Sequence, residues 1–453
     1  MKQSFYGGVH PHDRKEATCH LAAAPLSTAP EQVVIAMSMH VGAPCKPIVA
    51  KGDQVTVGQK IGEVAGLGAP IHASVSGTVV AVEPRPHPGG GNVMSVVIQN
   101  DFQDTFGSAL TPHPDYTGLT TEEIVEIVKE AGITGMGGAG FPTHVKISSG
   151  LGKVDTLILN GAECEPYITA DHRLMLEQGE RVIGGVRILM QAFGLKTATI
   201  GVEANKPDAI QHLQQLVGSG ADIQVESLRT RYPQGAEKQL IQRITGREVP
   251  PGGLPAHVGC AVFNVGTAAA VYDAVVEGKP LTHRILTVTG DAVQEPKNLL
   301  VPLGTSFQHI IDEGKGFKEN PDRVLTGGPM MGIAQHSLEV CCIKGTNAVL
   351  CLTEKEAAPV EQEETCLRCA RCVNVCPMHL TPVYMHLYIG KGQWKEAEAM
   401  NVMDCIECGS CNYICPARMH LVQSFRTAKT QLRQIAAKEK AAKEAAEKEA
   451  AKV

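Results

Sequence analysis

The stretch Cys366-x2-Cys369-x2-Cys372-x3-Cys376-Pro377 occurs again, with the same spacing, as Cys405-x2-Cys408-x2-Cys411-x3-Cys415-Pro416. Spacing of two, two and three residues lets three thiolates bind one corner of an iron–sulfur cubane, while the distant fourth thiolate turns outward. A zinc site needs four ligands in tetrahedral geometry and usually uses two Cys-x2-Cys knuckles, so this longer run of four cysteines is not the pattern of a zinc site. The duplicated pattern therefore predicts two [4Fe-4S] clusters and the transfer of single electrons.

In two-cluster ferredoxins the fourth cysteine of each run binds the other cluster. We therefore assign the ligands in a crossed arrangement. One cluster is assigned to Cys366, Cys369, Cys372 and Cys415, and the other to Cys405, Cys408, Cys411 and Cys376.

The bulk properties of the chain limit the classes of function that it can have. Its 453 residues exceed what one hydrophobic core usually supports, so several domains are expected. The net charge of −6 gives no basic footprint for nucleic acid. We find no signal peptide at residues 1–10 and no apolar run of about 18 residues, so we expect a cytoplasmic protein that meets a membrane only through a partner.

The N-terminal third has the pattern of short strands. Residues 49–58 (VAKGDQVTVG) and 70–80 (PIHASVSGTVV) place turn residues between alternating apolar positions. This style resembles the barrel-sandwich fold of biotinyl and lipoyl carrier domains. Those carriers present a modified lysine on the central hairpin, but residues 65–70 (AGLGAP) contain none, so we expect an unmodified structural module.

The middle of the chain predicts an α/β domain. Residues 121–130 (TEEIVEIVKE) have the apolar spacing of an amphipathic helix. Strands at 156–159 and 197–202, with a helix near 177–193 between them, indicate a parallel sheet. Apolar segments between 284 and 326 suggest a small β-grasp unit, and the Lys/Glu/Ala-rich residues 428–453 predict a solvated helix.

A glycine-rich loop at residues 132–140 satisfies the GxGxxG pattern. A dinucleotide-binding Rossmann turn needs a strand before it and a helix after it, whereas here a helix precedes the loop and Phe141-Pro142 follows at once. The glycines still allow backbone amides to approach an anionic phosphate. From its composition alone, the loop is equally consistent with a phosphate cradle and a tight structural turn.

Longer segments of the sequence favour a phosphate-binding role for this loop. Residues 135–146 (GMGGAGFPTHVK), 160–166 (NGAECEP), 231–237 (RYPQGAE) and 263–267 (FNVGT) resemble, in order, segments of the NADH-oxidising flavoprotein subunit of respiratory complex I. The resemblance implies a set of residues that hold FMN without a covalent bond: Gly135, Gly137, Gly138, Gly140, Asn160, Tyr232, Gly235, Asn264 and Thr267. It also implies a set that faces NAD(H), its substrate: Phe141, Lys146, Glu163, Glu165 and Glu237.

The chain departs from the complex I pattern at Met136, Ala162 and Ala236, where that family carries charged residues. These changes affect the predicted nicotinamide site more than the flavin site. A pair of histidines, His10 and His12, flanks Pro11, but with no cysteine or carboxylate at ligand spacing we interpret that segment as a loop.

Taken together, the segment FYGGVHP at 5–11, the carrier-like module, the flavin loop, the β-grasp unit and the paired cysteine motifs resemble, in that order, the C subunit of the Rnf complex. The implied fold is multidomain α/β. Its predicted parts are a barrel-sandwich module at 1–115, an FMN/NAD(H)-binding domain at 116–282, an SLBB-like β-grasp domain at 283–350, a helical two-cluster ferredoxin-like domain at 351–427 and the solvated helix at 428–453.

The resemblance also implies a function. Such a subunit passes electrons between two [4Fe-4S] clusters, FMN and NAD⁺/NADH, in an ion-translocating ferredoxin:NAD⁺ oxidoreductase. Its partners would be an iron–sulfur subunit that accepts electrons from ferredoxin and integral membrane subunits that export Na⁺ or H⁺. It would lie peripherally at the cytoplasmic face of the membrane.

Two alternatives remain open from the sequence. Cobalamin reductases of propanediol-utilising microcompartments share the flavin loop, the β-grasp unit and the paired clusters, but they carry the barrel-sandwich module at the C-terminus. The other alternative is an electron-relay scaffold that has lost NADH activity.

Overall fold

The computed structural model describes residues 4–220, 222–357 and 363–450. The N-terminal module is built from two small antiparallel sheets that enclose Ile35, Ile61, Ile71 and Ile98, none of which is exposed. One sheet has the order β2 (Gln32–Ala36), β8 (Asn92–Asn100), β7 (Gly77–Pro86) and β4 (Gln54–Val55). The other has the order β3 (Lys46–Pro47), β5 (Lys60–Glu63) and β6 (Ile71–His72). The predicted hairpin at 65–70 connects β5 to β6.

The second unit contains the predicted parallel sheet, in the order β11 (Ile223–Leu228), β10 (Ala198–Glu203), β9 (Thr156–Gly161) and β12 (Cys260–Asn264). The chain progresses from β9 outward to β11 and then returns to place β12 on the other side of β9. Ligands of such sheets bind beyond the carboxyl ends of the strands, where the strand order reverses. In this sheet that position lies between β9 and β12.

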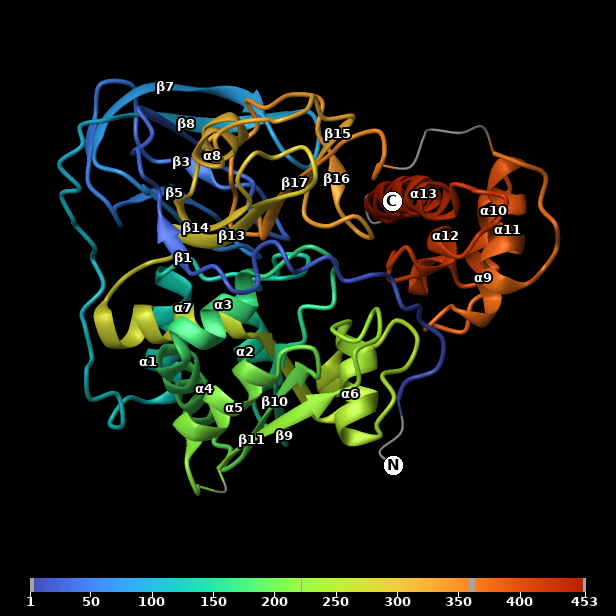
Figure 1. Cartoon of the computed structure of the whole chain (residues 1–453), viewed down its shortest axis with the longest axis horizontal. Helices are drawn as coiled ribbons and strands as arrows, with labels where there is room; N and C mark the ends of the chain where they lie inside the picture. The colour runs from blue at the N-terminus through green and yellow to red at the C-terminus, as the bar shows by residue number, and fades with distance from the viewer. Residues whose placement is uncertain (1–3, 221, 358–362, 451–453) are drawn as a thin grey trace.

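Helices cover both faces of this sheet (Figure 1). They are α1 (Thr121–Glu130), α2 (Thr143–Gly150), α3 (Ala170–Glu177), α4 (Gly179–Phe193), α5 (Pro207–Val217), α6 (Glu237–Thr245) and α7 (Val265–Glu277), with a 3₁₀ turn at Pro255–Val258. The predicted bounds of α1 are confirmed, because Thr120 and Glu123 form a capping box and Ile124 and Val128 are buried. The helix predicted near 177–193 is confirmed as α4, and the sequence analysis missed α3, which ends just before it at Glu177.

The β-grasp unit has a six-stranded sheet. Its order is β1 (Ala23–Pro25), β14 (Lys297–Pro302), β13 (His283–Thr289), β17 (Ala348–Leu352), β15 (Arg323–Thr326) and β16 (Ile333–Ala334), with α8 (Phe307–Glu313) against it. The N-terminal module was predicted to span 1–115, but residues 4–25 lie outside the barrel. In that segment, β1 pairs with β14 of the β-grasp sheet, and Val9 bonds to Tyr232 of the flavin domain. The predicted boundary at 350 also falls inside β17.

The C-terminal unit is helical, as predicted. It contains α9 (Arg371–Asn374), α10 (Pro382–Gly390), α11 (Trp394–Ala399), a 3₁₀ turn at Val402–Asp404, α12 (Ser410–Tyr413) and α13 (Leu421–Ala450). The predicted tail helix therefore begins at Leu421, inside the cluster domain. Phe425, Ala428 and Leu432 are buried in that domain, whereas the described side chains from Lys438 onward are exposed.

A buried lysine joins three of these units. Lys344, in the β-grasp unit, is not exposed, and its Nζ donates to the carbonyl oxygens of Pro70 and Gly132, each at 2.6 Å. Pro70 belongs to the barrel module, and Gly132 opens the glycine-rich loop. Burial lowers the pKa of Lys344 to about 7. The lysine therefore fixes the base of that loop to both neighbouring units.

We expect this site to make stability pH-dependent. The unfolded chain binds more protons than the folded one between pH 7 and the ordinary lysine pKa, so stability rises with pH across that range, by up to about 1.4 kcal/mol per pH unit. In Lys344→Met the part of this rise that Lys344 contributes should be absent, so the slope should be smaller than in the wild type. The measurement is the thermal midpoint of both proteins from about pH 7 to pH 8.5. Lys51→Met, at an exposed position, should keep the wild-type slope. Equal slopes in wild type and Lys344→Met would contradict the assignment.

Candidate functional site

The glycine-rich loop forms a closed, accessible turn. Gly135 N donates to Phe141 O at 2.7 Å, which closes the turn, and Met136 N donates to Thr267 Oγ1 at 3.0 Å, which ties the loop to the first turn of α7. Gly137 has φ +79° and is exposed, with Asn264 Nδ2 3.1 Å from the position of a Cβ. A Cβ at Gly138 would meet nothing. Backbone amides at this tip can therefore be approached closely, as a flavin phosphate requires.

Two asparagines mark the end of the sheet beside this loop. Asn160 on β9 and Asn264 on β12 are register partners in neighbouring parallel strands, at the point where the strand order reverses. Asn264 caps α7 by accepting from Gly266 N at 2.8 Å, and its Nδ2 donates to Asp171 Oδ2 at 2.6 Å. Asn160 Nδ2 donates to Gly235 O at 2.8 Å. The predicted flavin residues from four separate strings therefore converge at one edge of the sheet.

Three of the predicted nicotinamide residues lie at an accessible rim of this edge. Phe141 is 37% exposed. Lys146 Nζ donates to Glu237 Oε1 at 2.6 Å and lies 5.3 Å from the ring centroid of Phe263. An aromatic ring beside a lysine and a carboxylate suits a nicotinamide nucleotide, which offers a stacking face, phosphates and ribose hydroxyls.

The two other predicted acids are placed differently. Glu163 is buried at the start of α3, where its carboxylate accepts from Asp171 N at 2.6 Å and His172 N at 3.3 Å. Burial raises the pKa of Glu163 to about 7. Its geometry is that of a helix-capping acid, and the structure does not bring it to the rim with Phe141 and Lys146.

Glu165 points toward the β-grasp unit. Its Oε1 accepts from Met330 N at 2.7 Å and Met331 N at 3.1 Å, in the β15–β16 connection. Burial raises the pKa of the Glu165 carboxyl. A Cβ at Gly328 would approach Glu165 Cγ to 2.2 Å, so only glycine allows this contact. The sequence analysis missed this connection, although the string 327–332 (GGPMMG) is dense in turn residues.

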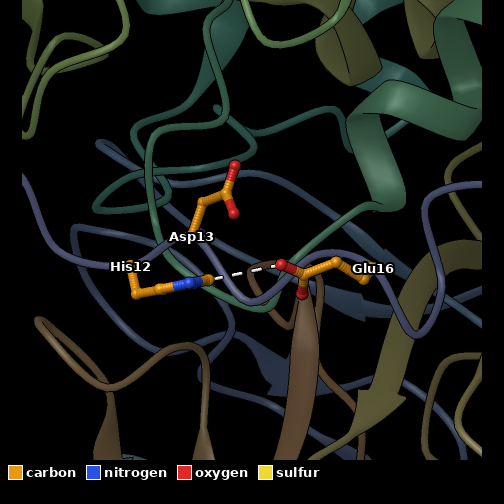
Figure 2. A group of neighbouring side chains, drawn as sticks. All are labelled: His12, Asp13 and Glu16. Atoms are coloured by element: carbon orange, nitrogen blue, oxygen red, sulfur yellow. Dashed lines mark ion pairs between the residues drawn. The ribbon is translucent and has the colours of Figure 1, made fainter.

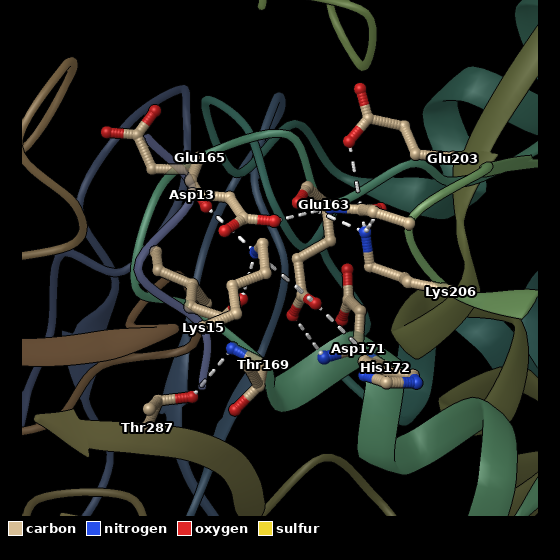
Figure 3. A network of polar contacts seen from close by, with 12 residues as sticks. Asp13, Lys15, Glu163, Glu165, Thr169, Asp171, His172, Glu203, Lys206 and Thr287 are labelled. Carbon is tan, nitrogen blue, oxygen red and sulfur yellow. Dashed lines mark hydrogen bonds and ion pairs between the residues drawn. The ribbon is translucent and has the colours of Figure 1, made fainter. Parts of the chain in front are cut away.

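Two buried lysines hold the acidic turn in place (Figure 3). Lys15 Nζ donates to the carbonyl oxygens of Glu165, at 3.0 Å, and Ile168. Lys206 Nζ donates to Ala162 O at 2.7 Å, and burial lowers its pKa. Sequence analysis did not identify either lysine, because a single lysine carries no local signal of burial.

The positions that depart from the complex I pattern are mostly interior. Met136 and Ala162 are buried, and Met136 contacts the guanidinium of Arg284, a buried residue that the sequence analysis also missed. Ala236 is the N-cap residue of α6. The side chains at 136 and 162 therefore face the protein, not the rim that carries Phe141 and Lys146.

The cysteines of the C-terminal unit gather in two groups. Cys376 lies close enough to Cys405, Cys408 and Cys411 to raise the pKa of each of these thiols, although burial raises them more, that of Cys405 to about 12. The same four cysteines line one cavity with apolar neighbours that include Leu380, Met385 and Phe425. Four soft sulfur donors around an apolar cavity fit an iron–sulfur cluster, whose positive iron would hold the thiols deprotonated.

The other group contains the remaining cysteines. Cys372 lies near Cys415 and Cys366, and Cys369 is exposed. The two loops have the same backbone form. Positive φ occurs at Arg368, Ala370 and His379 in the first and at the matching positions Glu407, Gly409 and Arg418 in the second. Arg368 N donates to Cys366 Sγ at 3.4 Å, and Glu407 N donates to Cys405 Sγ at 3.3 Å. Cys376 of the first run therefore lies with the thiols of the second, and Cys415 of the second lies with Cys366 and Cys372 of the first. The assignment of these thiols as crossed cluster ligands stays a prediction.

The two groups differ in their distance from the flavin edge. Cys408 packs in one apolar cluster with Val9 and Tyr232, and Cys164 lies at the margin of that cluster. A Cβ at Gly409 would come within 2.5 Å of Met330 O, next to the amides that bind Glu165. The group of Cys376, Cys405, Cys408 and Cys411 is therefore the inner one, and the group that includes the exposed Cys369 is the outer one.

One further cluster of metal-binding residue types lies on the N-terminal segment (Figure 2). His12 Nδ1 lies 3.9 Å from Glu16 Oε1, and Asp13 is nearby. The structure thus supplies carboxylates that the sequence analysis did not find beside His12. The side chains of His12 and Glu16 are 70% and 69% exposed, however, and such groups commonly occur without an ion.

Comparison with known families agrees with this arrangement. Residues 3–103 match the RnfC barrel sandwich hybrid domain, and residues 128–273 match the Nuo51 FMN-binding domain. Residues 285–334 match the SLBB domain, and residues 358–416 match the 4Fe-4S dicluster domain. These matches confirm the predicted fold class and the predicted FMN and iron–sulfur cofactors.

Two curated relatives match over nearly their whole length. The chain is 49% identical to the C subunit of the Na⁺-translocating ferredoxin:NAD⁺ oxidoreductase complex of Acetobacterium woodii, over 95% of the chain and 97% of that protein. It is 46% identical to the C subunit of the proton-translocating ferredoxin:NAD⁺ oxidoreductase complex of Clostridium ljungdahlii, over 97% of the chain and 96% of that protein.

The hydrogen bond from Met136 N to Thr267 predicts a role in flavin affinity. Thr267→Val should lose this bond, loosen the loop and weaken FMN binding about fivefold or more, which corresponds to about 1 kcal/mol. Thr143→Val is the matched control, because the Thr143 hydroxyl is also buried but has no hydrogen-bond partner among the described residues. Fluorescence titration of deflavinated protein measures both dissociation constants. Equal weakening in the two variants would rule out a specific role for Thr267.

The crossed grouping of the cysteines predicts which variants share a spectrum. Cys376→Ala should damage the same cluster as Cys405→Ala, and Cys415→Ala should damage the same cluster as Cys366→Ala. Low-temperature EPR of the dithionite-reduced proteins distinguishes the two pairs. If Cys376→Ala instead reproduces the spectrum of Cys366→Ala, each motif holds its own cluster and the crossed assignment is wrong.

Proposed function

The chain belongs to the family of C subunits of ion-translocating ferredoxin:NAD⁺ oxidoreductase complexes, and on this premise we propose that it exchanges electrons between two [4Fe-4S] clusters, FMN and NAD(H). The observation that carries the proposal is the position of the inner cysteine group against Tyr232, at the same edge as Asn160, Asn264 and the glycine-rich loop. A protein that exchanges electrons between a hydride donor and one-electron centres needs a flavin site in contact with such a centre.

Electrons enter at the outer cysteine group. Cys369 is exposed there, and the neighbouring Leu367 is 69% exposed, so a partner's redox centre can approach. They then pass to the inner group, whose Cys376, Cys408 and Cys411 are each at most 8% exposed. Burial of the inner group keeps it from exchanging electrons with solvent species.

At the flavin, the residues of this chain bind and orient the reactants. FMN, when bound, supplies the chemistry that joins one hydride to two single electrons. Asn160, Asn264 and Thr267 fix the loop and the sheet edge that would hold it. Phe141, Lys146 and Glu237 would bind NAD(H) at the open rim. Glu165, whose carboxylate is oriented by the amides of Met330 and Met331, would approach it from the side of the β-grasp unit.

Coupling to ion transport requires other subunits. No helix among the described residues is both long and apolar enough to cross a membrane. The partners are an iron–sulfur subunit that receives electrons from reduced ferredoxin and integral membrane subunits that export Na⁺ or H⁺. The chain would act as a peripheral subunit at the cytoplasmic face, where NAD⁺ is reduced.

The sequence left two alternative functions open, and the domain order argues against the first of them. The order of the matched domains, with the barrel-sandwich module first, is that of the C subunits and not that of the cobalamin reductases. The relay-scaffold alternative depends on lost nicotinamide binding. Met136 and Ala162 face the interior, so their departure from the complex I pattern does not remove charge from the rim, whereas Ala236 is half-buried and directly precedes Glu237 at the rim.

The acidic turn provides a test of hydride transfer. Glu165→Gln should slow anaerobic bleaching of the flavin by NADH about ten- to a hundredfold while flavin content stays near wild type, because one charge-assisted interaction is lost. Glu163→Gln is the comparison, since its carboxylate caps α3. It should lower the thermal midpoint without slowing the bleaching.

Stopped-flow absorbance measures the bleaching rate after iron, sulfide and flavin have been counted. About eight iron atoms and one acid-extractable FMN per chain are expected from the two clusters. Stoichiometric zinc with little sulfide would end the iron–sulfur interpretation. A wild-type flavin that NADH cannot bleach would favour the relay scaffold.

A further inference from the structure

The N-terminal segment Phe5–Val9, here called the strap, lies between the flavin domain and the cluster domain. In Figure 1 the chain runs from the N-terminus between these two units before it reaches β1. Val9 N donates to Tyr232 O at 2.8 Å, and Tyr232 N donates to Val9 O at 3.0 Å. Gly8 N donates to Val375 O at 2.8 Å, next to Cys376. The strap therefore bonds to a residue of the flavin edge and to the residue before a cysteine of the inner group.

Side chains hold the strap on both sides. The Arg231 guanidinium lies 5.1 Å from the ring centroid of Phe5, and its Nη1 donates to Phe5 O at 2.9 Å. The ring of Tyr6 stacks on His379 of the cluster domain, with centroids 4.7 Å apart. Phe5 and Val9 are buried, and Val9 packs in the same apolar cluster as Tyr232 and Cys408.

Two consecutive glycines permit this close fit. Gly7 and Gly8 have φ +76° and +77°, which side chains rarely adopt. A Cβ on Gly7 would lie 2.8 Å from the carbonyl oxygens of Val375 and Cys376, and a Cβ on Gly8 would lie 2.5 Å from Tyr232 O. These carbonyl oxygens are backbone atoms, so a methyl group on Gly7 would push the strap away from the Val375–Cys376 backbone, and one on Gly8 would push it away from Tyr232.

We propose that the strap is a positioning element for electron transfer, which sets the separation between the inner cluster and the flavin edge. The proposal rests on the proposed function, because it assumes a cluster at Cys376, Cys405, Cys408 and Cys411 and a flavin beside Tyr232. The strap supplies no proposed ligand of the cluster and no residue of the predicted flavin site. It acts through Tyr232 on one side and through the Val375–Cys376 backbone on the other.

The test uses Gly8→Ala in the full chain with its cofactors. Flavin and iron content, and the rate of flavin bleaching by NADH, should equal those of wild type. Electron transfer between flavin and clusters should slow about tenfold or more, since small misplacements of reacting groups carry penalties of this size. The EPR spectrum of the cluster lost in Cys376→Ala should shift, and that of the other cluster should not.

Gly152→Ala is the matched control. Gly152 has φ +71°, and its Cβ would meet nothing within 4 Å, so the variant has comparable backbone strain without a clash. It should keep the wild-type transfer rate. Gly8→Ala with native cofactor content and a wild-type transfer rate would overturn the proposal.

If Gly8→Ala loses a cofactor, a second variant tests the proposal instead. Tyr6 is 56% exposed, so Tyr6→Ala removes the stack on His379 without opening a core cavity. It should slow the transfer by about threefold, in line with the modest energy of one aromatic pair. A wild-type rate in Tyr6→Ala would then overturn the proposal.

Transfer is also followed in the other direction, from clusters reduced by titanium(III) citrate to the flavin. This direction needs no NADH. If NADH fails to bleach the wild-type flavin, the proposed hydride exchange fails, while the effect of the strap is still measured.

Discussion

Two buried lysines hold the turn after β9, and the placement of the flavin edge relative to its neighbours depends on that restraint. Lys15 comes from the N-terminal segment and Lys206 from the connection after β10, and both donate to carbonyl oxygens of the turn. Unpaired carbonyl groups and carboxylates at such depth would be costly. The lysines hold the turn so that three of its side chains accept hydrogen bonds from other parts of the chain. Glu163 accepts from α3, Glu165 from the β-grasp unit and Cys164 from the Gly235 amide. Five other parts of the chain therefore meet at this short turn.

The contacts between units follow from this meeting point. Met330 binds Glu165 through its amide and touches Gly409 through its carbonyl oxygen, so the β-grasp unit lies against both the flavin domain and the cluster domain. Lys344 joins the β-grasp unit to the barrel module and to the base of the glycine-rich loop. Because these are buried polar contacts with fixed geometry, they specify one arrangement of the units more strongly than apolar packing alone would.

The sequence predicted features that depend on local spacing. The bounds of α1 follow from Thr120, Glu123 and the apolar period, and the cysteine runs follow from their own spacing. Partners that meet only after folding were not predictable in this way. Nothing in the sequence near Lys15 indicates that its ammonium group is buried, or that it contacts Glu165, which lies 150 residues further along the chain. Glu163 and Glu165 are neighbours in an acidic string, yet backbone geometry sends one to a helix start and the other to a loop of another unit. The extent of the N-terminal module differed for the same reason, since residues 4–25 pair with strands and turns far along the chain.

The crossed grouping of cysteines has a consequence for assembly. If the ligands are crossed as assigned, each cluster takes ligands from both cysteine runs, so neither run can close around its own metal. Metal binding and folding are then one process, because the ligands converge only when the whole domain is formed. Loss of either centre, for instance by oxidation beginning at the exposed Cys369, would release the restraint on the other half as well. A domain that holds only one cluster should therefore be less stable and more readily unfolded than the fully loaded domain, whichever cluster is missing.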